Sequence, residues 1–219
     1  LAFESAQDAS VDQAVAAMEE VFRGQQANPE AHVAMAQVYS DANRGAQAVR
    51  VLQDAQSRFP AEAGISFELG ATLDRQKKFA ESEAIFRQLI SKDPQNAQAL
   101  NYLGYMLAER GERLTESVDF IKRALAIDPD NGSYLDSIGW AYFKDGKLDL
   151  AVEHLKRAAD LLTTNSVVQD HYADVLFRLG RVDDAIAAWN RALTGDLDAI
   201  ERSDIDKKIR NAKQKSSKK

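Results

Sequence analysis

Small residues recur along this chain at an almost constant interval of 34 residues. Counted from Ala36, the next four follow after 34, 34, 35 and 34 residues. A second small residue comes twelve residues after each of them, or thirteen in the third unit, and a large apolar residue comes four residues later still. A fixed period of this length is typical of stacked structural repeats. The three series are Ala36, Gly70, Gly104, Gly139 and Ala173; Ala48, Ser82, Ser117, Ala151 and Ala185; and Leu52, Phe86, Ile121, Leu155 and Trp189.

Gly139 shows why the small residues recur. It stands beside Trp140 in an amphipathic helical pattern, where a glycine costs about 1 kcal/mol of helix stability relative to alanine. We predict that each unit consists of two helices whose backbones approach closely at these positions, so that Gly139 meets Ala151. A four-helix bundle would give no reason for the fixed period.

Glycines and helix-capping residues indicate where the helices end and begin. Gly111, Gly146 and Gly180 fall where the first helix of a unit must stop, so we predict that they are C-terminal caps. Thr115, Asp149 and Asp183 follow and are predicted to cap the second helices. The additional residue of the third unit is predicted to lie in its turn, near Arg113.

The period divides the chain into units. The same register reaches the N-terminus, where it places Ala14, Met18 and Val21 on the inner face of a second helix and begins the chain inside a first helix. Residues after 199 alternate apolar and charged at helical spacing and predict a polar-faced cap. The predicted domain spans 1–213, with a partial repeat 1–28, full repeats 29–62, 63–96, 97–131, 132–165 and 166–199, and a capping helix at about 200–213, before a basic disordered tail 214–219.

Charge and composition exclude several classes of function. Residues 1–206 carry 21 basic and 34 acidic residues, a net −13, whereas 207–219 carry 7 basic residues and no acid. An acidic body disfavours nucleic acid, which needs a basic stripe. The chain has no cysteine for disulfides or thiolate metal sites, and no apolar run long enough for membrane insertion.

At this point the sequence resembles a known family. The stretches LDSIGWAYFKDGKLDLAVEHLKRA and LNYLGYMLAERGERLTESVDFIKRALAIDP are similar to the tetratricopeptide repeat, a helix–turn–helix of 34 residues. The resemblance covers nearly the whole chain and implies an all-α fold, an α-solenoid in which stacked repeats form a right-handed superhelix. The RNA-binding pentatricopeptide family, with a period of 35 and a basic groove, fits less well. Similarity to the C-terminal part of long bacterial tetratricopeptide proteins, several of them exported, suggests a bacterial source; it leaves cytoplasm and periplasm open and favours the periplasm.

The resemblance also implies where a ligand would bind. In the family, the fifth and ninth places of each first helix face a concave groove that holds peptides. Aromatic residues there would supply apolar anchors, and aspartates would pair with a Lys or Arg of the ligand. The alternative is that the aromatics pack between repeats and the aspartates are only solvated. The candidate groove residues are Phe67, Asn101, Tyr102, Tyr105, Asp136, Trp140, Asp170, His171 and Asp174.

We therefore expect a non-catalytic protein-protein interaction module that binds a peptide or protein segment. The alternative is a structural or assembly subunit that uses convex faces or repeat edges. Family members that grip terminal carboxylates use Lys and Asn at the inward places, where only Asn101 matches here, so this mode of binding is not expected. Asp170, His171 and Asp174 form the only cluster similar to a metal or acid–base site, and we expect no metal, cofactor or catalysis.

Overall fold

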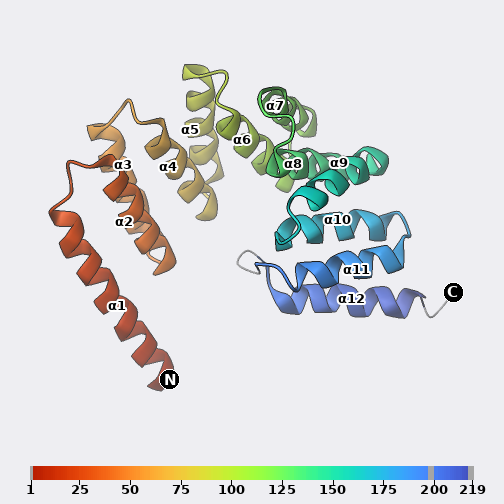
Figure 1. Cartoon of the computed structure of the whole chain (residues 1–219). Helices are drawn as coiled ribbons and strands as arrows, with labels where there is room; N and C mark the ends of the chain where they lie inside the picture. The colour runs from red at the N-terminus through yellow and green to blue at the C-terminus, as the bar shows by residue number, and fades with distance from the viewer. Residues whose placement is uncertain (1, 197–199, 217–219) are drawn as a thin grey trace. The chain divides into compact units, whose positions relative to one another are not determined.

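The computed structural model describes residues 2–196 and 200–216, and every regular element in these ranges is an α-helix (Figure 1). This confirms the predicted all-α class. The chain divides into two compact units, Leu1–Pro94 and Gln95–Lys219. The first contains α1 (Ala2–Arg23), α2 (Pro29–Asp41), α3 (Gly45–Arg58), α4 (Ala63–Arg75) and α5 (Phe79–Lys92). The second contains α6 (Ala97–Glu109), α7 (Leu114–Ile127), α8 (Gly132–Lys144), α9 (Leu148–Leu161), α10 (Ser166–Arg178), α11 (Val182–Ala192) and α12 (Arg202–Ser216).

Five pairs of consecutive helices form hairpins, and the repeating residues build the core of each unit. The side chains at the recurring positions are fully buried. Ala151 and Leu155 are 0% exposed, and so are their equivalents Ala48 and Leu52. The first and second helices of each hairpin therefore bury these positions between them, as expected for a helical repeat solenoid. The described part of the predicted tail, 214–216, continues α12, and residues 217–219 lie outside the described residues.

The glycines do allow close packing, and Gly104 meets Ser117 as predicted, but the nearest contact of Gly139 differs from the predicted pairing. A Cβ atom at Gly139 would lie 2.6 Å from Leu155 Cγ and 3.0 Å from Leu155 N, so its nearest neighbour is Leu155 rather than Ala151. Gly70 meets Phe86 in the same way. The first helix thus presents its bare backbone to the large residue of the second helix, because a bulky side chain fills the space that a Cβ would need.

A left-handed residue ends every first helix of the five hairpins. Gly111, Gly146 and Gly180 have φ values of 65°, 75° and 78°, as their predicted capping role requires. Asn43 and Lys77 take the equivalent places with φ of 56° and 60°. Each of these residues stands seven positions after the small residue of its first helix, so the corner has a fixed place in the repeat.

The third hairpin holds its additional residue in this corner. Its connection comprises residues 110–113, one more than 145–147 in the next hairpin, and Arg113 also adopts a left-handed conformation with φ of 44°. The insertion leaves the packing contact intact, since Ser117 Oγ donates to the Gly104 carbonyl at 2.6 Å.

The predicted caps of the second helices are wrong. The residues that precede α7, α9 and α11 form no side-chain capping bond. Asp149 and Asp183 instead lie within the first turn, where a carboxylate interacts favourably with the helix dipole. The side-chain caps belong to the first helices, where an asparagine accepts from a backbone N–H two or three residues on. These caps are Asn28, Asn96, Asn131 and Asn165.

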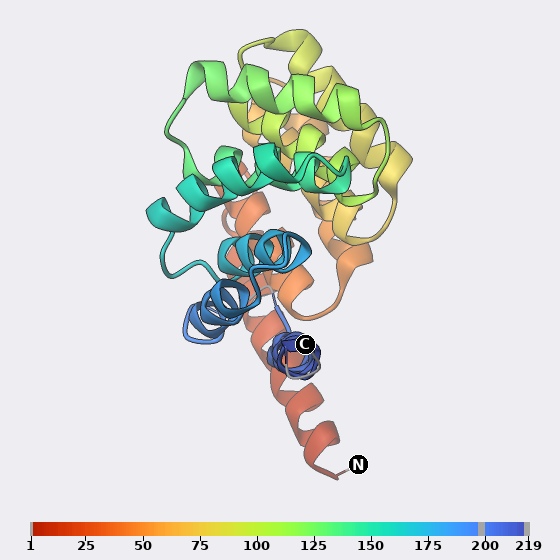
Figure 2. The same ribbon diagram turned by 90° about the vertical axis from the view of Figure 1, so that its right-hand side faces the viewer.

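α1 departs from the predicted helix–turn–helix, because it is one continuous helix of 22 residues. Ala9 stands at the place of the left-handed corner residue, seven positions after Ala2, and alanine disfavours that conformation. The predicted inner face is also wrong: Val15 is buried against α2, whereas Met18 and Val21 are 40% and 55% exposed. The N-terminal half of α1 extends past the ends of α2 and α3 (Figures 1 and 2).

Candidate functional site

A polar cavity lies across the first helices of the second unit. It is an open hollow of about 190 Å³, and α6, α8 and α10 contribute to its walls. Four of the predicted groove residues, Asn101, Tyr102, Tyr105 and Asp136, line it together. Sequence reasoning missed its remaining lining residues, which are Ser133, Ser137, Asn165, Val167 and Val168.

Asn101, in the wall of this cavity, has unused hydrogen-bonding capacity. Its Oδ1 is buried and has no hydrogen-bond partner among the described residues. By contrast, the Oδ1 of Asn165 accepts from the backbone N–H of Val168 at 3.0 Å and so caps α10. A buried amide oxygen without a partner is costly, and a ligand would recover that energy once the Asn101 amide turns its oxygen into the cavity.

Asp136 and His171 form a buried pair beside the cavity. The two carboxylate oxygens of Asp136 lie 3.0 and 3.1 Å from His171 Nδ1, and the two residues are each 6% exposed. The imidazole stacks on Trp140, with ring centroids 3.9 Å apart and an interplanar angle of 12°. Burial alone would lower the pKa of His171. The charge and hydrogen bond of Asp136, together with the charges of Asp170 and Asp174, outweigh this effect and raise the pKa above its ordinary value.

Trp140 is a packed residue rather than an open aromatic surface. It is 8% exposed and its ring also stacks on Phe143, with centroids 4.9 Å apart. Its Nε1 donates to Glu109 Oε2, and the Lys144 ammonium lies 5.0 Å from the ring centroid. Because His171, Phe143, Lys144 and Glu109 all contact the indole, Trp140 serves the packing of α8 against its neighbours.

Asp170 and Asp174 bind a lysine of the same chain. Lys208 Nζ, on α12, lies 2.7 Å from Asp170 Oδ1 and 2.9 Å from Asp174 Oδ2. Trp189 Nε1 donates to Asp170 at 2.9 Å and to Asp174 at 3.1 Å. Lys208 follows Asp174 by 34 residues, so the repeat period placed it at the equivalent inward position and could have predicted the contact.

The charges of this cluster perturb one another. Burial and the adjacent Asp170 carboxylate raise the pKa of Asp174, against the opposing effects of Lys208 and Trp189. Burial would lower the pKa of Lys208, but the two carboxylates outweigh it and raise that pKa. The acid pair is therefore largely satisfied within the chain, and α10, α11 and α12, which lie side by side in Figure 1, are joined by it.

The predicted residues therefore fall into separate groups. The cavity group and the Asp136–His171–Trp140 group adjoin through Asp136, and the Lys208 cluster lies on α10 to α12. Phe67 belongs to the first unit, on α4, where its ring lies edge-on to Phe86 at 5.4 Å. In the described ranges 2–196 and 200–216, no three acidic, histidine or cysteine side chains gather as a metal site would require.

Comparisons with known proteins agree with the repeat architecture. Models described as tetratricopeptide repeat match residues 33–96, 68–132 and 133–161. The TPR repeat-containing protein PA4667 of Pseudomonas aeruginosa is 31% identical over 123 residues, which are 56% of this chain and 21% of that protein. The match thus spans about a fifth of the relative's length.

Solved structures show the same fold. TTC0263, a thermophilic TPR protein of Thermus thermophilus, is 18% identical with a TM-score of 0.71, over 84% of this chain and 98% of that chain. PilW, a type IV pilus biogenesis factor, is 22% identical with a TM-score of 0.71, over 84% of this chain and 85% of that chain. None of the helices in the described part is long and apolar enough to span a membrane.

Proposed function

Because the chain belongs to the tetratricopeptide repeat family, whose fold implies a role in protein–protein interaction or scaffolding, we propose that it binds a segment of a partner protein along α6, α8 and α10. The proposal includes no catalytic step. The observation that carries it is Asn101, whose amide lines the cavity with a buried oxygen that no described group satisfies.

The chemistry of the cavity favours an extended peptide main chain. The Asn101 amide can accept a backbone N–H and donate to a backbone C=O, as a peptide group requires. Tyr102, Tyr105 and Val167 add apolar area for a side chain of the ligand. The tyrosines and Asn101 therefore carry recognition in this proposal.

The aspartates have a different role in the proposal from the one that the sequence suggested. Asp136 is paired with His171, and Asp170 and Asp174 are paired with Lys208, so a basic ligand side chain would have to displace these contacts. We therefore assign the aspartates to the framework of the site.

The proposal can be tested with peptides selected on the protein itself. Peptides from a random displayed library would be selected on the full chain, and their affinities measured by calorimetry against Asn101→Ala. We expect affinity to fall about tenfold or more, since one hydrogen-bonding group with a buried partner contributes on the order of 1.4 kcal/mol. Tyr102→Ala should weaken the same peptides.

Asn190→Ala provides the matched control, because Asn190 is an exposed asparagine on α11 away from the cavity lining. Peptides that bind the Asn101→Ala, Tyr102→Ala and Asn190→Ala variants as tightly as the parent chain would rule out this cavity as the binding site. Circular dichroism of each variant verifies that the helices are retained.

A further inference from the structure

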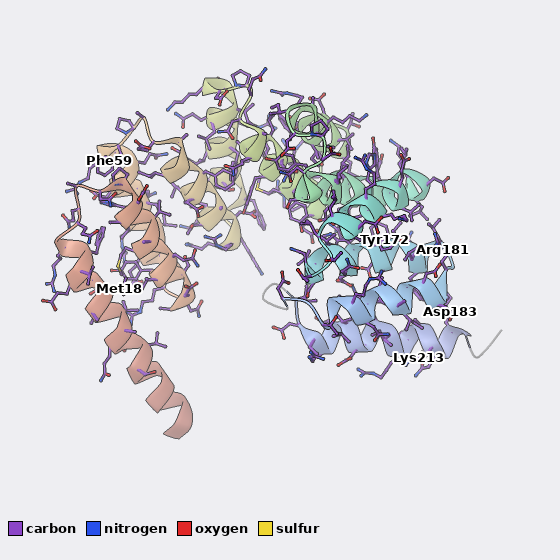
Figure 3. The ribbon with its side chains drawn as sticks, viewed as in Figure 1. Met18, Phe59, Tyr172, Arg181, Asp183 and Lys213 are labelled. Atoms are coloured by element: carbon purple, nitrogen blue, oxygen red, sulfur yellow. The ribbon has the colours of Figure 1, made fainter. Side chains whose placement is uncertain are left out.

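A second hollow lies in the same compact unit as the cavity around Asn101, near the C-terminal ends of α8 and α10. Its volume is about 250 Å³, compared with about 190 Å³ for that cavity. Side chains of α8, α10, α11 and α12 line it, and none of them also lines the cavity. The end of α10 and the C-terminal half of α12 reach the same end of the unit, where Arg181 and Lys213 are labelled in Figure 3. The two sites are therefore separate.

Aromatic side chains form the apolar part of this hollow. They come from three helices: Phe143 on α8, Phe177 on α10 and Trp189 on α11. Phe143 and Phe177 are partly buried, and the ring centroids of Phe177 and Trp189 lie 5.5 Å apart. Aromatic rings pair favourably with further rings, edge to face or offset. The hollow is therefore suited to an aromatic side chain of a ligand.

Two cations lie over these rings and have donors left for a ligand. The Arg178 guanidinium lies 5.5 Å from the ring centroid of Phe143, and the Lys215 ammonium lies 5.1 Å from that of Phe177. Both side chains are exposed, and neither forms an ion pair or a hydrogen bond with another residue in 2–196 or 200–216. A guanidinium can grip a carboxylate with two parallel N–H donors. The rim of the hollow is therefore suited to a carboxylate.

The other charged groups of the hollow are already paired. Lys208 lies within 2.9 Å of Asp170 and Asp174, and the Trp189 indole donates to the same two carboxylates. A basic ligand would have to displace Lys208 from them. The exposed amide of Asn211, by contrast, lines the hollow and forms no hydrogen bond within the described ranges, so it can donate to an incoming carboxylate or peptide group.

The hollow is locally positive in an otherwise acidic chain. Arg178, Lys208 and Lys215 stand against Asp170 and Asp174, which leaves a formal net charge of +1. Residues 1–206, in contrast, carry a net −13. Like charges disfavour contact with an acidic partner over most of the chain, so an acidic partner is directed to this hollow.

We propose that this hollow binds an acidic segment of a partner protein. An aromatic side chain of the segment packs on the three aromatic rings, and a neighbouring Asp or Glu carboxylate pairs with Arg178 and Lys215. Charge complementarity selects this partner over a basic one, because Lys208 holds the acidic groups of the hollow. The proposal does not depend on the cavity around Asn101.

Tryptophan fluorescence of the full chain tests the proposal, because Trp189 lines the hollow. The probe is the peptide Gly-Glu-Phe-Glu-Gly with both termini blocked, titrated to about 5 mM because short linear peptides bind weakly. We expect a saturable change in emission that persists in Trp140→Phe, which leaves Trp189 as the one tryptophan of the chain. Replacing the phenylalanine of the peptide by serine, or both of its glutamates by glutamine, should weaken binding at least fivefold.

Charge substitutions distinguish the rim of the hollow from the general charge of α12. Arg178→Gln combined with Lys215→Gln should lower the affinity about fivefold, because exposed ion pairs each contribute modestly. The matched control is Lys207→Gln combined with Arg210→Gln, which removes the same charge from exposed residues of α12 that do not line the hollow. The control should bind as the parent chain does. No saturable binding by the parent chain, or an equal loss in both double variants, overturns the proposal.

Asn101→Ala separates this proposal from the one for the cavity. The peptide should bind this variant as tightly as the parent chain, because Asn101 does not line the hollow. A loss of affinity in Asn101→Ala would place the peptide in the cavity instead and overturn the assignment to the hollow. Circular dichroism checks that every variant is folded.

Discussion

Gly139 and Gly64 both lie in first helices, yet a methyl group added to each would meet different surroundings. At Gly139 the added carbon would lie 2.6 Å from a side-chain carbon and 3.0 Å from a backbone nitrogen of Leu155. At Gly64, near the start of α4, it would meet no heavy atom within 4 Å apart from the adjacent residues and backbone of its own helix. One glycine is required by packing, and the other only lowers helix propensity.

Substitution by alanine should therefore have opposite effects at the two positions. We expect Gly139→Ala to lower the free energy of unfolding by about 1–3 kcal/mol through overpacking. Gly64→Ala should raise it by up to about 1 kcal/mol through helix propensity. Denaturant unfolding of the two variants measures both effects, and a Gly139→Ala chain more stable than its parent would contradict the packing argument.

His171 should make stability depend on pH. Its pKa is raised in the folded state, because Asp136, Asp170 and Asp174 outweigh the effect of burial. The stabilisation from its charged form is then complete below the ordinary histidine pKa of about 6.5 and is lost as the pH rises through the raised value. The excess stability of the parent chain over His171→Gln should accordingly be larger at acidic than at alkaline pH.

His154 offers a control of opposite sign. Burial lowers its pKa, so protonation of the unfolded state should weaken the fold as the pH falls below the ordinary value. The excess stability of the parent chain over His154→Gln should therefore decrease toward acidic pH. Thermal unfolding between about pH 5 and 9 measures both differences, and a flat profile for His171→Gln would exclude the buried ion pair.

At the scale of the helix, Lys208 forms an ionic contact that joins α12 to the hairpin before it. Lys208 lies within 2.9 Å of both Asp170 and Asp174, whereas its neighbour Lys207 is exposed. The apolar contribution to the same junction comes from Ile205, Ile209 and Ala212, all buried. α12 thus combines an apolar inner face with an ionic contact at the inward position of the repeat.

Lys208→Met should loosen α12. It leaves two partly buried carboxylates without their cation, and we expect a loss of about 1–3 kcal/mol, below the full cost of a broken buried pair because Lys208 is 33% exposed. Lys207→Met should change stability by less than about 0.5 kcal/mol. Hydrogen exchange should quicken within 202–216 for the first variant only, and equal exchange in both would show that the apolar face alone holds α12.

At the scale of the whole molecule, the repeat architecture could be predicted because the residues that form the same packing contact recur five times in the sequence. Gly139 marks this contact even though its nearest neighbour was misjudged. α1 was not predictable in this way, because the period alone does not show that the chain continues as one helix through Ala9 instead of turning there.

The candidate site was harder to predict, because residue types do not reveal which polar groups already have partners. Asp136, Asp170 and Asp174 were expected to face a ligand, yet His171 and Lys208 lie beside them in space. Asn101 was identified from its place in the repeat, but only the structure shows that its buried oxygen lacks a partner in the described chain. The place of a residue in the repeat predicts the direction in which its side chain points. Which polar groups it pairs with depends on distances that the sequence does not give.

The extra residue in the connection between α6 and α7 has a consequence for how such an array can diverge. Arg113 takes up the added length at the corner, while the bond between Ser117 and Gly104 beneath it keeps its normal geometry. An insertion is thus accommodated in the connection between two helices, where it leaves the packing of the helices unchanged. Repeats that arise by duplication can therefore come to differ in the length of their connections. New loops and new binding specificities can appear there without loss of the common core packing.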